Sequence, residues 1–403
     1  MSVVLLGSTS GSVTLQEPAV AGSTVIDLPA TSGTMAVLPT ATSVLPQASG
    51  GTGTTTGYYG FKSRIINGGM VIDQRNAGAS VTPTTNQYSL DRWEFYVTQS
   101  SKVSFQQNAG SVTPPAGFKN YLGLTVGASA NVTVGSTDLF ILDQYIEGYN
   151  IADLGFGAAG ASTVTLSFWV RSSLTGTFGG SLTNSGNSRS YPFTYTISSA
   201  NTWEQKTITV AGDTSGTWLS TNGTGLGVRF SIGTGSTYLG TSGSWAGAGY
   251  FGATGQTNLI TTNSATFYIT GVQLEKGSTA TSFDYRPYGT ELQLCQRYLP
   301  AWSFTNGQYI SQGWSYNTTS ALHTIITPVS TRVAPTGITT TGSYTSLVSG
   351  AGTVNATSVA FSSSSVNNLT LLVSAASGYT SGYGQALYPS TSTATILGTG
   401  CEL

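Results

Sequence analysis

Charged side chains are scarce in this chain. They make up 7% of its 403 residues and leave a formal net charge of −1, whereas an ordinary soluble domain has roughly 25% charged residues. A protein that binds nucleic acid needs many Lys and Arg to neutralise phosphates, so the composition argues against nucleic acid as a partner. Disordered chains combine low hydrophobicity with high net charge. Because 39% of the residues are hydrophobic, wholesale disorder is also disfavoured.

Residues that bind metals are almost missing. The chain has one histidine, His323, and two cysteines, Cys295 and Cys401. A single histidine excludes a zinc site built from several histidines of one chain, and cysteines this far apart do not form a CxxC motif. We therefore expect no metal and no cofactor. His323 is interpreted as a strand residue on a threonine-rich surface, and Cys401 is expected to be more exposed than Cys295.

Apolar runs are short. None approaches the roughly 18–20 residues that a membrane-spanning helix needs. The first twelve residues, MSVVLLGSTSGS, have no basic region and too short an apolar run for a secretory signal. We therefore expect no membrane insertion.

Charge divides the chain into three parts. Residues 1–57 carry two charged side chains and end in a Gly/Thr-rich stretch that is typical of a linker. Residues 58–289 carry 12 of the 14 basic and 11 of the 15 acidic residues, and residues 290–403 carry only four charges. We predict an N-terminal β-rich attachment segment, a central domain and a smaller C-terminal domain with these boundaries.

Apolar and polar residues alternate with a period of two along many short segments. Clear examples are 93–97, 122–126, 164–170 and 226–232. Many short strands without long helices predict a jelly-roll β-sandwich for residues 58–289. The C-terminal part is predicted to be a second β-sandwich, with strands over 322–329, 353–361, 369–373 and 393–397. The one short helix is expected over 291–298, and the fold class is all-β.

Closely spaced carboxylates would be needed for an enzyme that cleaves glycosidic bonds, about 5–9.5 Å apart. In an extended strand Asp91 and Glu94 face opposite sides, and Asp143 and Glu147 lie roughly 13 Å apart. Pairs between strands or subunits stay open, but no catalytic motif is present, so we predict that the chain is not an enzyme. The acids most suited to Ca²⁺ are interpreted as turn caps or partners of arginine instead: Asp138, Asp143, Glu147 and Asp284.

Aromatic side chains are concentrated in two glycine- and amide-rich stretches, 236–251 and 302–316. Sugars have apolar faces that stack on aromatic rings and polar edges that form hydrogen bonds. We therefore predict glycan contacts in these stretches, at Tyr238, Trp245, Tyr250, Trp302, Trp314 and Tyr316. The alternative that the rings pack in the core or at a subunit interface stays open.

Several segments resemble tailed-bacteriophage tail fibre and minor tail proteins that carry a carbohydrate-binding-module-like jelly roll. The most specific is VQLEKGSTATSFDYRP at 272–287. The other segments lie at 7–38, 61–76, 201–218, 266–291, 291–298, 326–336 and in the final CEL. Cys401 departs from the family pattern, in which a small Ser or Ala is more usual at that place.

The resemblance implies a virion protein, a homotrimer whose N-terminus joins the phage baseplate, tail or neck and whose C-terminal domain contacts host-surface polysaccharide. It implies assembly in the bacterial cytoplasm, where thiols stay reduced, so no disulfide is expected. A fibre or decoration protein of the phage head or neck is the alternative. A polysaccharide-degrading tailspike and a secreted glycan-binding adhesin are further alternatives.

Overall fold

The computed structural model describes residues 3–6, 12–15 and 61–403. The chain forms two compact units, Met1–Tyr59 and Gly60–Leu403. In the first unit, β1 (Val3–Leu6) and β2 (Ser12–Leu15) pair in antiparallel fashion. The rest of the predicted attachment segment and its Gly/Thr linker lie outside the described residues.

The second unit is built almost entirely from strands, which confirms the all-β fold class. Its described residues contain a single α-helix, α1 (Tyr288–Gln296), close to the helix expected over 291–298. Short 3-10 turns lie at η2 (Ala109–Ser111), η3 (Gly148–Asn150), η4 (Ala152–Leu154), η5 (Ser236–Tyr238) and η6 (Leu259–Thr261). No helix in the described part of the chain has the length and apolarity to cross a membrane.

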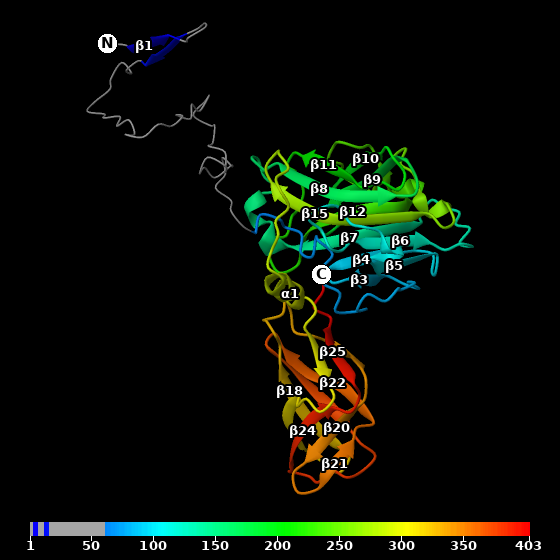
Figure 1. Ribbon diagram of the computed structural model, residues 1–403, viewed down its shortest axis with the longest axis vertical. Coiled ribbons are helices and arrows are strands. Elements are labelled where there is room, and N and C mark those ends of the chain that lie inside the picture. Colours follow the sequence, from blue (N-terminus) through cyan, green and yellow to red (C-terminus); the bar gives the residue numbers. More distant parts are fainter. Residues whose placement is uncertain (1–2, 7–11, 16–60) are drawn as a thin grey trace. The chain divides into compact units, whose positions relative to one another are not determined.

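Two antiparallel sheets form the first sandwich, which spans residues 61–287 (Figure 1). The six-stranded sheet has the order β10 (Ser190–Ile197), β9 (Gly176–Thr183), β12 (Thr224–Thr234), β7 (Leu139–Glu147), β4 (Trp93–Val97), β3 (Gln87–Leu90). The five-stranded sheet has the order β11 (Glu204–Val210), β8 (Val164–Ser172), β15 (Thr266–Lys276), β6 (Leu122–Val126), β5 (Val103–Gln107). Two short strands, β13 (Leu239–Gly240) and β14 (Gly252–Ala253), pair in parallel within the long β12–β15 connection.

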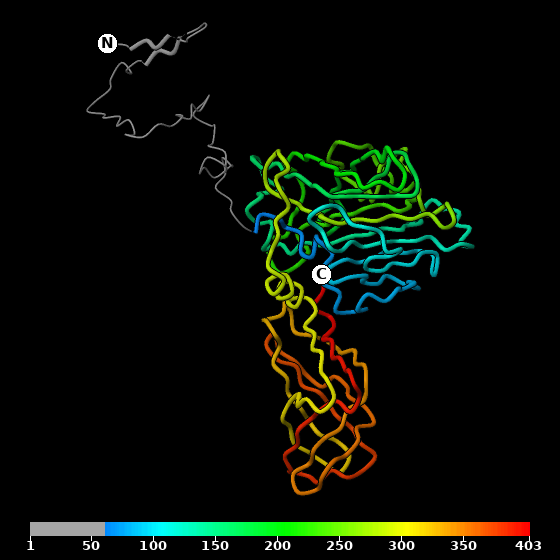
Figure 2. Tube along the Cα trace, viewed as in Figure 1, coloured from blue at the N-terminus to red at the C-terminus, as the bar shows by residue number. Residues whose placement is uncertain are grey.

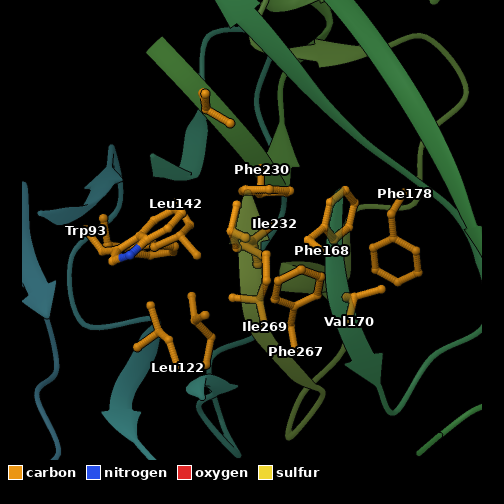
Figure 3. Close-up of a cluster of buried hydrophobic side chains, with 14 of the residues drawn as sticks. Trp93, Leu122, Leu142, Phe168, Val170, Phe178, Phe230, Ile232, Phe267 and Ile269 are labelled. Carbon is orange, nitrogen blue, oxygen red and sulfur yellow. The ribbon is translucent and has the colours of Figure 1, made fainter. Parts of the chain in front are cut away.

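The core of the first sandwich lies between these two sheets. The apolar residues of the alternating segments point inward and are fully buried, as Figure 3 shows for Trp93, Phe168 and Phe230. The Phe230 ring of the six-stranded sheet lies 4.9 Å from that of Phe168 in the five-stranded sheet, so this pair connects the two sheets. Within its own sheet, Phe230 lies 6.4 Å from the ring of Trp93. Such contacts add about 0.5–1.5 kcal/mol beyond the burial of apolar area. The period-two pattern thus predicted both the strands and the inward face.

The second sandwich spans residues 301–399 and also has two sheets. The three-stranded sheet has the order β16 (Ala301–Thr305), β25 (Thr393–Thr399), β19 (Gly337–Thr341). The seven-stranded sheet has the order β21 (Gly352–Asn355), β20 (Tyr344–Val348), β24 (Gly384–Pro389), β17 (Ser311–Ser315), β18 (Ser320–Ile326), β23 (Asn368–Ser374), β22 (Ser358–Ser365). The single strand predicted over 353–361 is wrong, because the chain breaks there into β21 and β22, which lie at opposite edges of the sheet.

Two side chains in the C-terminal part of the chain are more buried than the sequence suggested. His323 on β18 is fully buried, with Nδ1 3.3 Å from Ser311 Oγ and Nε2 3.4 Å from Gln385 Oε1, so its expected place on a threonine-rich surface is wrong. Cys401 is also fully buried, and its thiol donates to the carbonyl of Val333 at 3.3 Å. The expectation that Cys401 is the more exposed thiol is therefore wrong, although both cysteines are free thiols as predicted.

The last residues of the chain return to the first sandwich. Glu402 forms ion pairs with Arg75 and with the buried Arg92, and Tyr88 donates to the carbonyl of Leu403 at 3.3 Å. Figure 2 shows this C-terminal end (red) next to the early residues of the first sandwich (blue). Cys401 comes directly before these residues and contacts Val333 instead of the first sandwich. The domain boundary predicted between residues 289 and 290 falls inside α1 and stays a prediction.

Candidate functional site

Strand β17 presents exposed side chains on one face and buried ones on the other. Gln312 and Trp314 point to solvent, and the chain continues to the exposed Tyr316. On the neighbouring strand β24, Tyr388 shares this face, because Ala386 pairs with Gln312 in the register and Tyr388 is two residues further along. We name the surface made by Tyr309, Gln312, Trp314, Tyr316 and Tyr388 the aromatic face.

The rings of the aromatic face are arranged in two pairs. Trp314 is 51% exposed and its ring lies 6.1 Å from that of Tyr316, at an interplanar angle of 66°. Tyr309 is 62% exposed and its ring lies 5.8 Å from that of Tyr388, at an angle of 78°. A surface hollow of about 370 Å³, lined in part by Tyr309 and Gln312, lies on this face. Apolar ring faces and an amide are therefore presented together to solvent.

The residue paired with Trp314 on the neighbouring strand helps to keep its ring exposed. Its partner on β24 is Gly384, and a Cβ added there would meet no atom within 4 Å. The opposite neighbour, on β18, is Leu322. Because glycine contributes no side chain, one flank of the indole ring stays open to a ligand.

The aromatic face has almost no electrostatic field. Between residues 298 and 401 the only Asp, Glu, Lys or Arg is Arg332. Its guanidinium donates to the carbonyls of Cys401 and Asn222, so it belongs to the junction with the first sandwich. Stacking and neutral hydrogen bonds are what this surface offers to a ligand.

The six predicted glycan contacts do not form one site. Trp314 and Tyr316 lie together on the aromatic face. Trp302, on β16, is partly buried against the core of the second sandwich. The role of all six in binding a glycan stays a prediction.

The three aromatic residues predicted in 236–251 lie in the first sandwich. The indole Nε1 of Trp245 donates to the carbonyl of Ala211 at 2.7 Å, and its ring packs against Phe156, Tyr191 and Trp218 at 5.3–5.9 Å. The Tyr238 ring stacks on Phe251 at 5.3 Å and Tyr250 packs over Gly240. Each ring is in contact with other side chains.

Sequence reasoning did not select Tyr309, Gln312 and Tyr388. Tyr309 and Gln312 lie inside the stretch 302–316, but Tyr388 is distant in sequence. The alternation Gly384, Ala386, Tyr388 against buried Gln385 and Leu387 was a usable signal for a strand with one open face. Its pairing with β17 could not be read from the sequence.

A row of mostly buried polar side chains, which we name the polar row, lies on the outer face of the six-stranded sheet. One cross-strand row takes a residue from each of five adjacent strands: Tyr88, Glu94, Asp143, Arg229 and Ser181. The carboxylates of the row thus come from neighbouring strands, the arrangement that the sequence left open. Directly opposed residues have Cβ atoms roughly 4.5–5.5 Å apart.

Burial has the largest effect on the pKa values of the two carboxyl groups in this row. It raises the pKa of Asp143, although Arg229 opposes the shift with its Nε 3.6 Å from Asp143 Oδ2. Burial also raises the pKa of Glu94, with a further contribution from Glu402. Among the described residues, Asp143 Oδ1 and Ser181 Oγ have no hydrogen-bond partner.

The four acids considered for Ca²⁺ have the partners predicted for them. Asp143 and Asp284 lie beside Arg229 and Arg286, at 3.6 and 3.4 Å, and Glu147 binds Arg297 at 2.6 Å. Asp138 caps a turn by accepting from the backbone N–H of Gly135 at 2.7 Å. In the described part of the chain, no group of three or more His, Cys, Asp or Glu is placed to hold a metal ion.

No protein-family model and no curated protein matches this chain. Among solved structures it is similar to the enzymatically active domain of tailspike protein 4 from bacteriophage CBA120, with 12% identity and a TM-score of 0.31, over 54% of this chain and 22% of that one. It is also similar to the module TmCBM61 in complex with beta-1,4-galactotriose (10% identity, TM-score 0.24, 46% of this chain and 88% of that one). A family 11 carbohydrate-binding module of a cellulase from Clostridium thermocellum gives 12% identity and a TM-score of 0.24, over 51% of this chain and 100% of that one. These values are too low to assign the chain to any of these proteins or to transfer a ligand.

Proposed function

We propose that this chain is a phage tail fibre protein that attaches the virion to its host by binding a neutral surface polysaccharide without cleaving it. The observation that carries the glycan-binding part is the aromatic face. Clustered exposed rings on the surface of a single chain mark contact sites, because exposure of apolar area to water gains nothing for folding. Amide and hydroxyl groups beside the rings suit a ligand with apolar faces and polar edges.

Charge and geometry support a neutral, extended ligand. A nearly uncharged surface cannot steer a strongly acidic polysaccharide toward the protein. From Gln312 to Tyr316 the aromatic face runs roughly 13 Å along the strand direction, at about 3.3 Å per residue. Several sugar rings of a chain would therefore lie along the face, rather than one ring in a deep pocket.

The virion part of the proposal rests on the sequence resemblance. It comprises a homotrimer joined through residues 1–57 to the baseplate, tail or neck, with the second sandwich facing the host. Three copies per fibre would raise a weak single-site affinity through effective concentration. A head or neck fibre or decoration protein remains the alternative, and immunogold labelling of particles distinguishes the two by the place of the label.

Binding is tested by shielding Trp314 instead of removing it. A Cβ at Gly384 would meet no atom within 4 Å, so Gly384→Leu is expected to fold normally, and its longer side chain would reach over the flank of the paired Trp314 ring. Gly289→Leu, at an equally open position on α1, is the matched control. We expect fluorescently labelled Gly384→Leu protein to lose at least tenfold in adsorption to host cells, and Gly289→Leu to bind like the parent. Equal adsorption of both variants would contradict the proposal.

The trimer has its own measurement. Native mass spectrometry of the full chain should give three times the 41.5 kDa of one chain. A folded monomer at concentrations that support cell binding would remove the trimer from the proposal and leave glycan binding untouched.

A hydrolytic function is the second candidate, favoured by one observation. Glu94 and Asp143 are cross-strand neighbours, and retaining glycosidases hold their two carboxyl groups about 5–5.5 Å apart. Against it, Asp143 is 2% exposed and lies beside Arg229. Release of reducing sugar from host polysaccharide by the parent, lost in Glu94→Gln, would establish hydrolysis. No release is what the binding function predicts.

A further inference from the structure

A cavity of about 260 Å³ lies in the first sandwich, apart from both surfaces described above. Three segments line it: residues 63–71 near the start of the sandwich, residues 117–120 of the loop before β6, and residues 283–291 that lead into α1. None of its residues belongs to the aromatic face or to the polar row.

Aromatic rings form one wall of this cavity. Phe118, Phe283 and Tyr285 contact one another with ring centroids 4.9–5.6 Å apart. The hydroxyl of Tyr285 donates to the carbonyl of Gly117 at 2.9 Å, which fixes the ring against the loop. Tyr285 and Tyr288 are nevertheless 59% and 61% exposed, so the wall is open to solvent.

Charged groups around the cavity cancel. Arg286, whose side chain is 6% exposed, lies 3.4 Å from Asp284 and 3.3 Å from Glu291. Lys119 is exposed and supplies the second positive charge. Two cations and two carboxylates give a formal charge of zero, while the Lys119 ammonium and the Asn120 amide provide polar groups in the lining.

We propose that this cavity binds a single neutral sugar ring. The aromatic wall suits the apolar face of a pyranose, and the polar groups of the lining suit its hydroxyl edge. The volume is below the roughly 300–1,000 Å³ of pockets for drug-sized ligands, which favours one ring over an oligosaccharide. The zero formal charge disfavours uronic and sialic acids. The site goes beyond the proposed function, because it lies in the other sandwich and shares only the class of ligand.

Gly69 allows the cavity to be filled. It lies in the lining, and an added Cβ would meet Val71 Cγ2 at 3.5 Å and the Phe283 ring at 3.7 Å, which are ordinary contacts. Gly69→Leu should therefore fold and occupy the ligand space. The adjacent Gly68 is unsuitable, because a Cβ there would overlap the carbonyl of Val272 at 2.0 Å. Gly186→Leu serves as the control, because this glycine lies in an exposed turn outside the cavity and an added Cβ would meet only Ser188 Oγ, at 3.8 Å. Thermal melting shows whether both variants fold.

The test is saturation-transfer NMR and titration of the full chain with methyl glycosides of glucose, galactose, mannose and N-acetylglucosamine, and with methyl glucuronide. We expect at least one neutral glycoside to bind, Gly69→Leu to weaken its binding by at least tenfold, and Gly186→Leu and Trp314→Ala to leave the binding unchanged. The proposal is overturned if no neutral glycoside binds, if Gly69→Leu binds as the parent does, or if the glucuronide binds best. Loss of binding only in Trp314→Ala would assign the sugar to the aromatic face, which would support the proposed function and contradict the cavity site.

Discussion

The two sandwiches share a two-sheet architecture but differ in the residues that they expose. The first contains most of the charged residues, and many of them pair with a partner, as Arg189 does with Asp213 at 2.7 Å. The second is almost uncharged, and it exposes rings that its core does not need. All seven tryptophans lie in described residues, and only Trp314 is more than half exposed. The exposure of Trp314 is therefore informative, because the other six tryptophan side chains are mostly covered by the rest of the chain.

The largest expected effect is a difference in unfolding free energy between alanine variants of two tryptophans, one in each sandwich. Trp93→Ala removes a fully buried ring that packs on Phe230 in the core of the first sandwich, and should cost about 3–5 kcal/mol of unfolding free energy. Trp314→Ala should change the unfolding free energy by no more than about 0.5 kcal/mol, because the ring is exposed. Chemical denaturation of both variants measures the difference. Equal losses of unfolding free energy in the two variants would mean that Trp314 is a core residue, and the contrast between the two sandwiches would not hold.

The contact between the sandwiches should be nearly as sensitive. Glu402→Ala leaves the buried Arg92 without its carboxylate, and loss of one partner of a buried ion pair costs about 3–5 kcal/mol. Asp153→Ala is the matched control, since Asp153 is 40% exposed where it pairs with Arg64 and should cost about 0–1 kcal/mol. Similar melting temperatures for the two variants would mean that the C-terminal tail does not stabilise the junction.

The sequence predicted what depends on local pattern. Alternation placed the strands around Phe168 and Phe230 with their buried faces, and the short helix α1 was found within three residues at its start. The sequence did not predict long-range pairing. The cross-strand neighbours Glu94 and Asp143, and the burial of Cys401 beside Val333, depend on contacts between residues that are distant in the sequence. Thr-rich surroundings suggested exposure for His323, but the strand turns its side chain inward, toward Gln385.

Trp245 gives a smaller effect that sharpens the contrast with Trp314. Its ring is partly buried and contacts Trp218, Tyr191 and Phe156, so Trp245→Ala should destabilise by about 1–3 kcal/mol. Adsorption to cells should be that of the parent at temperatures where the variant stays folded. A stable variant that no longer adsorbs would make Trp245 a glycan contact after all.

The smallest effect is an opposite response of the two regions to pH. Burial raises the pKa of Asp91 in the first sandwich from 3.8 to about 6, so the stability associated with its neutral form is present below pH 3.8 and lost as the pH rises through 6. Burial lowers the pKa of His323 in the second sandwich from 6.5, so its neutral form contributes stability above pH 6.5 that is lost as the pH falls.

Two variants separate these responses by thermal melting between pH 4.5 and 7.5. The melting temperature of Asp91→Asn relative to the parent should rise with pH, and that of His323→Gln relative to the parent should rise as the pH falls. Differences that do not vary with pH would show that neither group titrates as its burial requires.

The most direct test of glycan binding by the aromatic face is the adsorption of Trp314→Ala protein to host cells, measured beside its melting curve. Trp245→Ala is the companion variant in the same assay. We predict that Trp314→Ala melts like the parent and loses at least tenfold in adsorption, whereas Trp245→Ala melts earlier and adsorbs normally below its transition. Parent-like adsorption by a fully folded Trp314→Ala would contradict the account.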